Sequence, residues 1–208
     1  LNSIKYNGEP IIVTSGTQII RAFAINDDGL ISDEYSATYR IYKSNTPYIF
    51  KDEKVENIVR TILGKSTGTI VYGDLEKILT FSNIVNGTPI DGSIYSLEDL
   101  SAMENLSTVE LHGETELTSL HALSTLKNVK SITLKSCGIT DGVLEDISSM
   151  IWLEELNLAD NFISDIAPIT SFIKLKSLNL SGNVIKDITD LTDSLNNLQS
   201  LDLSKNML

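Results

Sequence analysis

His112 lies between Glu110 and Glu114, and these three side chains come nearest to a metal site in type and spacing. A zinc site needs three or four close ligands in fixed geometry. The only other histidine, His121, belongs to a different segment of the repeat pattern described below. Three close ligands are therefore not evident, and we expect neither a metal nor a cofactor.

Two acidic side chains and one cysteine are the remaining candidates for chemistry. Glu110 and Glu155 are expected two strands apart, about 9.6 Å at ~4.8 Å per strand, a separation that a pair of glycosidase carboxylates tolerates. Both would lie on an open face, however, with no wall to exclude water or to raise a pKa. Cys137 is expected to point inward, without a basic neighbour to stabilise a thiolate. We therefore expect no enzymatic activity.

The elements that must position these residues are copies of one repeat. Three segments with the same pattern start 22 and then 23 residues apart: Leu153–Ile163, Leu175–Ile185 and Leu198–Leu208. Each reads LxxLxLxxN, then one residue and an aliphatic side chain, which is the pattern and period of a leucine-rich repeat. Weaker copies occupy Val129–Ile139 and Leu106–Glu114. Stacked copies bury their leucines against one another, at roughly 1.5–3 kcal/mol per fully buried aliphatic side chain.

The conserved spacing of the asparagine within each copy predicts an internal ladder. Where the backbone turns at the end of each strand, some of its N–H and C=O groups have no partner in the sheet. A buried amide side chain can form hydrogen bonds with these groups. We expect the ladder to consist of Cys137, Asn161, Asn183 and Asn206, because cysteine also occurs at this position of such repeats. Glu114 occupies the same position in the first copy. Since a buried carboxylate is costly, we expect that coil to bulge and expose Glu114.

The short strand of each copy alternates between buried leucines and outward residues. The outward residues should form columns on the concave face, where a partner would bind. The candidates on this face are Glu110, His112, Thr133, Lys135, Glu155, Asn157, Asn179 and Asp202. The alternative is a merely solvated face, because these side chains are small and polar and lack the Tyr, Trp and Arg of binding hot spots.

Trp152, the only tryptophan, is a separate candidate for partner binding. The equivalent position in the other copies is polar, which predicts that Trp152 faces solvent: Asn105, Asn128, Lys174 and Asn197. An exposed tryptophan can anchor a partner. The alternative is an indole that lies over neighbouring coils, under the Lys174 ammonium.

Composition narrows the class of partner. The 208 residues carry a net charge of −12, which disfavours nucleic acids and anionic lipid surfaces. No uninterrupted apolar stretch approaches 18 residues, so we expect no membrane insertion. The single cysteine excludes an internal disulfide.

Residues 1–46 differ from the rest, with short β-rich runs and a hairpin turn at Asn26–Gly29. This region resembles the latter part of the chitobiase/β-hexosaminidase C-terminal-type domain, a small immunoglobulin-like β-module of secreted bacterial proteins. The segments that carry the resemblance are Gly8–Ile11, Ser15–Thr17, Ile20–Ala24, Asp28–Gly29 and Ser36–Tyr39. Because the first strands are missing, we expect the module to be truncated at Leu1.

Residues 47–105 are expected to form a helical cap and a degenerate first repeat. Glu53–Leu63 has helical apolar spacing and Gly64 as a stop, and further helix starts are expected at Asp74 and Ser96. A repeat array needs such a cover for its first coil.

Residues from about 50 to 208 resemble internalin-like leucine-rich repeat proteins. The cap carries the resemblance at Leu63–Lys65, Gly73–Leu75, Ser96–Leu100 and Glu104–Leu106, and the repeats at Leu156–Leu158, Asn161–Ile166 and Asn183–Ile188. The stretch 82–95 and Glu114 depart from it. The resemblance implies a secreted or wall-attached bacterial protein whose concave face binds another protein.

The sequence thus predicts an α/β leucine-rich repeat solenoid with a helical N-terminal cap, preceded by a small truncated all-β module. The expected domains are 1–46, 47–105 and 106–208. We expect a non-catalytic extracellular or cell-surface module that binds a host or cell-surface protein, or else a glycan. The alternative is an accessory or spacer region of a larger secreted carbohydrate-active or cell-wall protein. Because the chain ends in mid-coil at Leu208, we expect further repeats, or a monomer that dimerises weakly through its open last coil.

Overall fold

The computed structural model describes residues 16–22, 35–41, 44–191 and 195–208. Contacts within the chain divide it into two units, Leu1–Thr46 and Pro47–Leu208. The first unit contains β1 (Gly16–Ala22) and β2 (Tyr35–Ile41), which pair antiparallel with Gly16 opposite Ile41. The expected turn at Asn26–Gly29 and the start of the β-module lie outside the described residues, so the immunoglobulin-like module stays a prediction.

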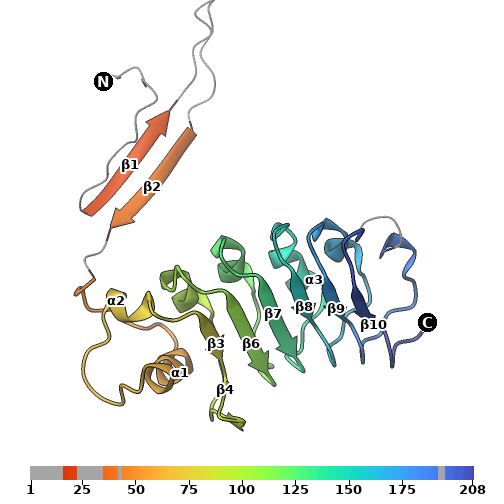
Figure 1. The fold of residues 1–208 in the computed structure, drawn as a ribbon, viewed down its shortest axis with the longest axis horizontal. Helices are drawn as coiled ribbons and strands as arrows, with labels where there is room; N and C mark the ends of the chain where they lie inside the picture. The colour runs from red at the N-terminus through yellow and green to blue at the C-terminus, as the bar shows by residue number, and fades with distance from the viewer. Residues whose placement is uncertain (1–15, 23–34, 42–43, 192–194) are drawn as a thin grey trace, which may run out of the picture. The chain divides into compact units, whose positions relative to one another are not determined.

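The second unit is built around a six-stranded parallel sheet in the order β10-β9-β8-β7-β6-β3 (Figure 1). Its strands are β3 (Thr80–Ser82), β6 (Thr108–His112), β7 (Ser131–Lys135), β8 (Glu155–Asn157), β9 (Ser177–Asn179) and β10 (Ser200–Asp202). Each of the strands β6 to β10 belongs to a different predicted copy of the repeat. β3 comes from a further coil, which sequence analysis placed in a degenerate first repeat.

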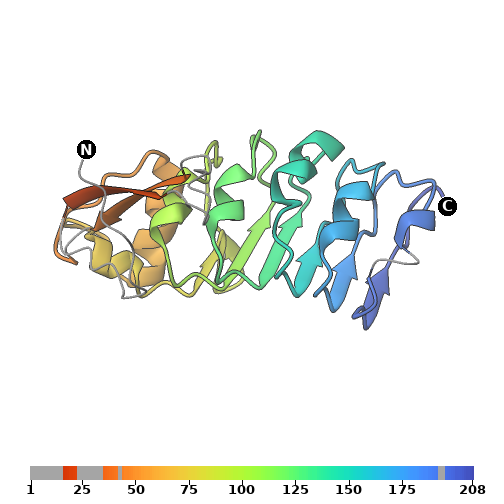
Figure 2. The same cartoon turned by 90° about the horizontal axis from the view of Figure 1, so that it is seen from above.

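Short helical segments return the chain from the end of one strand to the start of the next, on the other side of the sheet (Figure 2). They are η1 (Glu98–Ala102), η2 (His121–Thr125), α3 (Asp141–Leu144) with η3 (Glu145–Ile147), η4 (Ala167–Ser171) and η5 (Thr189–Leu191). Most are 3₁₀ turns because their apolar side chains recur every three residues, as in the buried Leu117, Leu120, Leu123 and Leu126. The buried side chains of the strands and of these return segments form one continuous core.

Helix α1 (Glu53–Leu63) precedes the sheet and is well specified at both ends. The Asp52 carboxylate accepts hydrogen bonds from the backbone N–H groups of Lys54 and Val55, and Gly64 ends the helix at φ 61°, where a side chain would be strained. Val55, Ile58 and Val59 are fully buried and belong to the same core as the repeats.

The segment between α1 and β6 differs in detail from expectation. Helix α2 (Tyr72–Leu75) begins at Tyr72, two residues before the predicted start, because the Asp74 side chain turns back to accept from the Val71 N–H (3.1 Å). The stretch 82–95 contains a small hairpin of β4 (Ile84–Val85) and β5 (Thr88–Pro89). Its two-residue turn uses Asn86 and Gly87, both at positive φ, as a type I′ turn requires.

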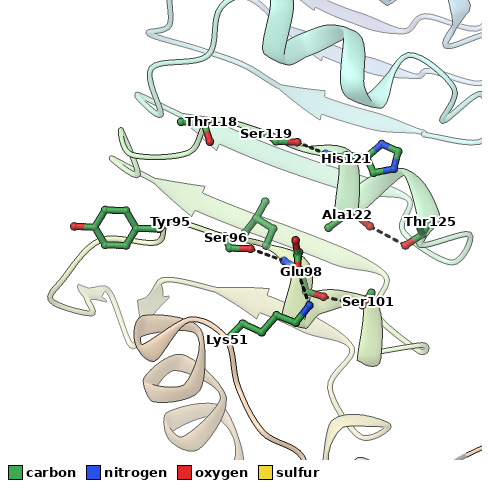
Figure 3. A pocket seen from close by; sticks show the side chains of 11 residues that line it. Lys51, Tyr95, Ser96, Glu98, Ser101, Thr118, Ser119, His121, Ala122 and Thr125 are labelled. Carbon is green, nitrogen blue, oxygen red and sulfur yellow. Dashed lines mark hydrogen bonds and ion pairs between the residues drawn. The ribbon is translucent and has the colours of Figure 1, made fainter.

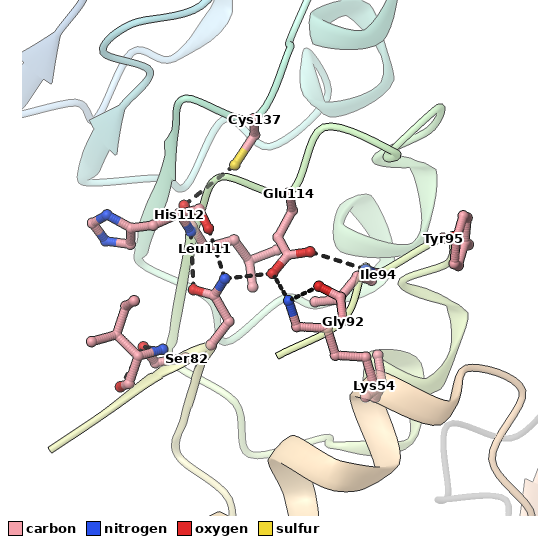
Figure 4. A network of polar contacts seen from close by, with 12 residues as sticks. Lys54, Ser82, Gly92, Ile94, Tyr95, Leu111, His112, Glu114 and Cys137 are labelled. Atoms are coloured by element: carbon pink, nitrogen blue, oxygen red, sulfur yellow. Dashed lines mark hydrogen bonds and ion pairs between the residues drawn. The ribbon is translucent and has the colours of Figure 1, made fainter. Parts of the chain in front are cut away.

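Glu114 is buried, with 2% of its surface exposed, so the prediction that its coil would bulge and expose it was wrong. Its carboxylate accepts hydrogen bonds from the Lys54 ammonium, the Asn83 amide and the Ile94 N–H (Figure 4). The Lys54 ammonium also donates to the carbonyl of Gly92 (2.7 Å). A buried carboxylate is tolerable when it is paired and hydrogen-bonded in this way. The prediction failed because the counter-ion comes from α1, 60 residues away.

No helix within the described ranges is both long and apolar enough to cross a membrane.

Candidate functional site

The outward strand residues form a continuous surface, which we call the outer face of the sheet. The pairing of the strands places Thr108, Ser131, Glu155, Ser177 and Ser200 in one column, and Glu110, Thr133, Asn157, Asn179 and Asp202 in the next. In a third, His112 lies opposite Lys135. Along β6 to β9 these residues alternate with buried ones, whereas in β10 the intervening Leu201 is 44% exposed. The structure thus brings together the side chains that the sequence placed on the concave face.

Glu110 and His112 contact each other at one end of this face. Glu110 Oε1 lies 3.0 Å from His112 Nε2, and Glu110 Oε2 accepts a hydrogen bond from the Ser82 hydroxyl (3.2 Å). Glu114 points into the core instead of joining them. Among the residues that the structure describes, no three His, Cys, Asp or Glu side chains form a group that could hold a metal.

Three side chains of the middle column accept hydrogen bonds from the backbone at the end of their own strand. The Oδ1 atoms of Asn157, Asn179 and Asp202 accept from the N–H groups of Ala159, Ser181 and Ser204, at 3.0, 2.9 and 2.9 Å. The hydrogen bond from the Ser204 N–H is the main cause that holds the pKa of Asp202 below its usual value. Among the residues that the structure describes, the side-chain N–H₂ groups of Asn157 and Asn179 have no hydrogen-bond acceptor.

Several charged side chains on and beside this face have polar or charged partners. The Glu155 carboxylate accepts from the Ser131 hydroxyl (2.9 Å), and Lys135 Nζ lies 3.6 Å from Asp160 Oδ2. At the start of the strands, Glu154 binds both Lys176 and Lys130, and hydrogen bonds from these two ammonium groups lower the pKa of Glu154 to about 2.

The predicted internal ladder has the following contacts. Asn161 accepts from the N–H groups of Cys137 and Ile139 and donates to carbonyls of its own and the preceding coil. Asn183 and Asn206 donate in the same way one and two coils later, and they accept from the N–H groups of Ile163 and Ile185. The Cys137 thiol donates to the carbonyls of Leu111 and Lys135, and burial raises its pKa to about 11. Such a thiol is a poor nucleophile.

Trp152 is half-buried and packs on the core, an arrangement that follows the alternative of an indole lying over neighbouring coils and not that of a side chain facing solvent. Its indole lies under an ammonium group, but this group belongs to Lys127 of the preceding coil (4.0 Å from the ring centre) and not to Lys174. The indole Nε1 is buried and has no hydrogen-bond partner within the described part of the chain.

A second asparagine ladder, which sequence analysis missed, runs along the start of the strands. The side-chain amides of Asn105, Asn128 and Asn197 donate to the carbonyls of Glu76, Glu104 and Ile173, each in the preceding coil (2.7–2.9 Å). The signal was present in the sequence, because asparagine recurs directly before the first apolar residue of three copies. Trp152 and Lys174 occupy the two positions of this ladder that lack the amide.

A pocket of about 590 Å³ lies on the side of the return segments, lined by residues of η1 and η2 and by Lys51 and Tyr95 (Figure 3). Three of its hydroxyl groups are engaged locally: Ser101 donates to the carbonyl of Glu98, Thr125 to that of Ala122, and Ser119 to Asp146. At its rim Lys51 is paired with Glu98. The pocket wall contains one histidine, His121, which the sequence analysis did not predict to bind a metal or a partner.

Comparisons with known proteins agree with this geometry. Residues 151–193 match the family model for two copies of leucine rich repeats. The second unit has the leucine-rich repeat fold. The structure of an internalin, InlF, from Listeria monocytogenes matches with a TM-score of 0.64 and 24% identity, over 76% of this chain and 44% of that chain. A leucine-rich repeat protein of Leptospira interrogans matches with a TM-score of 0.52 and 22% identity, over 65% of this chain and 33% of that one.

Both likenesses show the fold alone, and this chain spans less than half the length of either protein. No curated protein matches the chain.

Proposed function

We propose that this chain is a non-catalytic binding module that recognises a protein partner through the outer face of its sheet. The observation that carries the proposal is the in-register alignment of β6 to β10, which presents two columns of polar side chains on a rigid, continuous surface. Rigid presentation lowers the ordering cost of binding. The committed Oδ1 atoms of the middle column hold its amides in fixed orientations.

The candidate residues favour binding over chemistry. Glu110 and His112 form a pair on a partly exposed surface, and the buried Cys137 thiol stays protonated. The pocket beside η1 contains Glu98 as its one carboxylate, and Lys51 neutralises it. These groups lack the enclosed acid–base pair that hydrolysis of a glycoside requires.

The proposal extends to location. The fold of the second unit is that of an internalin, and we propose an extracellular or cell-surface position for the chain. On this proposal α1 and α2 serve as the cap of the array, since α1 buries its apolar face in the core before the first strand.

The test is capture of proteins from host-surface and cell-wall extracts by the immobilised chain. A variant with Thr133→Arg and Ser177→Arg places two bulky cations on the outer face. A control variant with Thr118→Arg and Thr140→Arg places the same groups on exposed positions of the return side. We expect a protein that binds the wild type and the control and is lost with the outer-face variant.

Two results would contradict the proposal. Equal capture by both variants would exclude the outer face. Binding to insoluble cell-wall glycan that survives protease treatment of the extract would favour the accessory role in a carbohydrate-active or cell-wall protein.

A further inference from the structure

Trp152 occupies a position at which the fold favours asparagine. Asn128 and Asn197, at the same position of other coils, each bridge to the preceding coil through a hydrogen bond to a backbone carbonyl. Within the described ranges Trp152 makes no such bond, and its own N–H is buried without a partner. A buried unpaired donor destabilises a protein. Residues that break a local rule in this way are expected where function demands them.

The surroundings of Trp152 are apolar and exposed. Ile151 and Ile173, at equivalent positions of successive coils, expose 48% and 52% of their surface. The corresponding residues of the two preceding coils are Lys127 and Glu104, both exposed. We call the group of Lys127, Ile151, Trp152, Ile173 and Lys174 the edge patch. It borders the start of β8 and β9 and is separate from the columns of the outer face.

The charge of the edge patch is opposite to that of the chain. Its two ammonium groups, on Lys127 and Lys174, have no carboxylate partner among the residues that the structure describes. The neighbouring Lys130 and Lys176 differ, because both are bound to Glu154. A chain of net charge −12 thus keeps two uncompensated cations beside its exposed isoleucines and its only tryptophan. Aromatic anchors flanked by cations fit a partner with the complementary charge.

We propose that the edge patch binds a peptide segment of a protein partner in which a carboxylate side chain lies next to an aliphatic or aromatic one. The apolar side chain covers Ile151 and Ile173 against the indole, and the carboxylate binds Lys174 or Lys127. This inference rests on the proposed binding function and names the chemistry of the partner segment.

The test begins with selection of random displayed peptides on the immobilised full chain. Peptides that also bind an Ile151→Ser/Ile173→Ser variant are removed first. The enriched peptides are synthesised and titrated into the chain, with the fluorescence of Trp152 as the signal, since no other tryptophan contributes.

We expect the enriched peptides to carry Asp or Glu beside an apolar residue and to change the Trp152 emission. Replacing that acid by its amide, or Lys174 by Glu, should weaken binding about tenfold, as the loss of a charge pair beside an apolar contact does. Lys186→Glu is the matched control, because Lys186 is an exposed lysine beyond the other end of β9. It should leave the affinity unchanged.

Several outcomes would overturn the proposal: no enriched peptide, enriched peptides that are basic, or affinities insensitive to Lys174→Glu. Two changes in the Trp152 emission would also overturn it, if the edge variants abolish them: a change on addition of cell-wall glycan, or a change caused by self-association as the concentration of the chain rises. Peptides lost with Thr133→Arg/Ser177→Arg and retained by the edge variants would reject the edge patch and support the outer face, so the two failures are distinguishable.

Trp152→Asn separates a binding role from a packing role. It restores the amide of the second ladder and removes the unpaired indole N–H. We expect a melting temperature equal to or above that of the wild type, together with loss of peptide binding followed by calorimetry. A clear drop in melting temperature with peptide affinity retained would assign the indole to packing and refute the proposal.

Discussion

The ammonium of Lys54, near the start of α1, is bound to the carboxylate of Glu114, which follows β6, and both side chains are buried. The pair joins the helical segment to the repeat array, and Asn83 and the backbone of Gly92 and Ile94 complete its hydrogen bonds. In a leucine-rich repeat, Glu114 occupies the position of the ladder asparagine. At this position a charged carboxylate thus replaces the neutral amide, and Lys54 of α1 neutralises it.

Removing one partner of this pair should destabilise the second unit strongly. Glu114→Ala leaves the Lys54 ammonium buried and unpaired, and we expect a loss of about 3–5 kcal/mol in the free energy of unfolding. Urea unfolding, followed by circular dichroism, measures the change. The double variant Lys54→Met/Glu114→Leu should recover much of the loss, because neither charge remains.

Lys51→Met is the control for that experiment. It breaks the Lys51–Glu98 pair, which is solvent-exposed, and should leave the urea midpoint unchanged. Equal losses of stability in Glu114→Ala and Lys51→Met would show that burial does not determine how much the Lys54–Glu114 pair stabilises the protein.

The asparagine ladder should contribute most where it is buried. Asn183 donates to the carbonyls of Leu158 and Leu180 and accepts from the Ile163 N–H. Asn183→Ala leaves these groups unsatisfied, and we expect a loss of about 1–3 kcal/mol in the free energy of unfolding. Asn206→Ala in the last coil should lose less, because Asn206 is half-buried and water can replace its amide. A larger effect at Asn206 would contradict this account.

Cys137 should be unreactive in the folded protein. Burial raises the pKa of its thiol to about 11, so very little thiolate is present at about pH 8. We expect a thiol-specific reagent to label Cys137 only after unfolding in urea. The sign of the pH effect follows: stability falls as the pH rises from the ordinary thiol pKa of about 9 through about 11, because only the unfolded thiol ionises there. Rapid labelling of the folded chain would contradict the buried position.

Asp74 should stabilise the region around α2 in a pH-dependent way. Hydrogen bonds from the Lys65 ammonium and the Val71 N–H lower the pKa of Asp74 to about 2 from 3.8. The stabilisation is therefore present in full above the ordinary pKa and is lost as the pH falls through about 2. Asp74→Asn should lower the melting temperature at neutral pH, and the difference from the wild type should vanish in acid. Asp91→Asn, at an exposed carboxylate, is the control.

Periodicity made the repeat array predictable, down to its columns. The outward positions of a strand alternate strictly, so a correct alignment of the copies also assigns Thr133, Asn157 and Asn179 to one column. Ladder residues are equally local in origin, because each serves its own coil and the one before it. The strand β3 was not predicted, because Phe81 and Ser82 belong to a copy of the repeat whose spacing differs from that of the other copies.

The sequence by itself determined the repeat, its inward and outward faces and the identity of the ladder residues, because these follow from the spacing of side chains along one chain. Only the tertiary structure decided the environment of Glu114 and Trp152. The partner of each comes from another coil or helix: Lys54 lies 60 residues before Glu114, and Lys127 lies 25 residues before Trp152. Burial and electrostatic stabilisation depend on which groups from distant parts of the chain come into contact. The spacing of residues within one repeat does not predict these contacts.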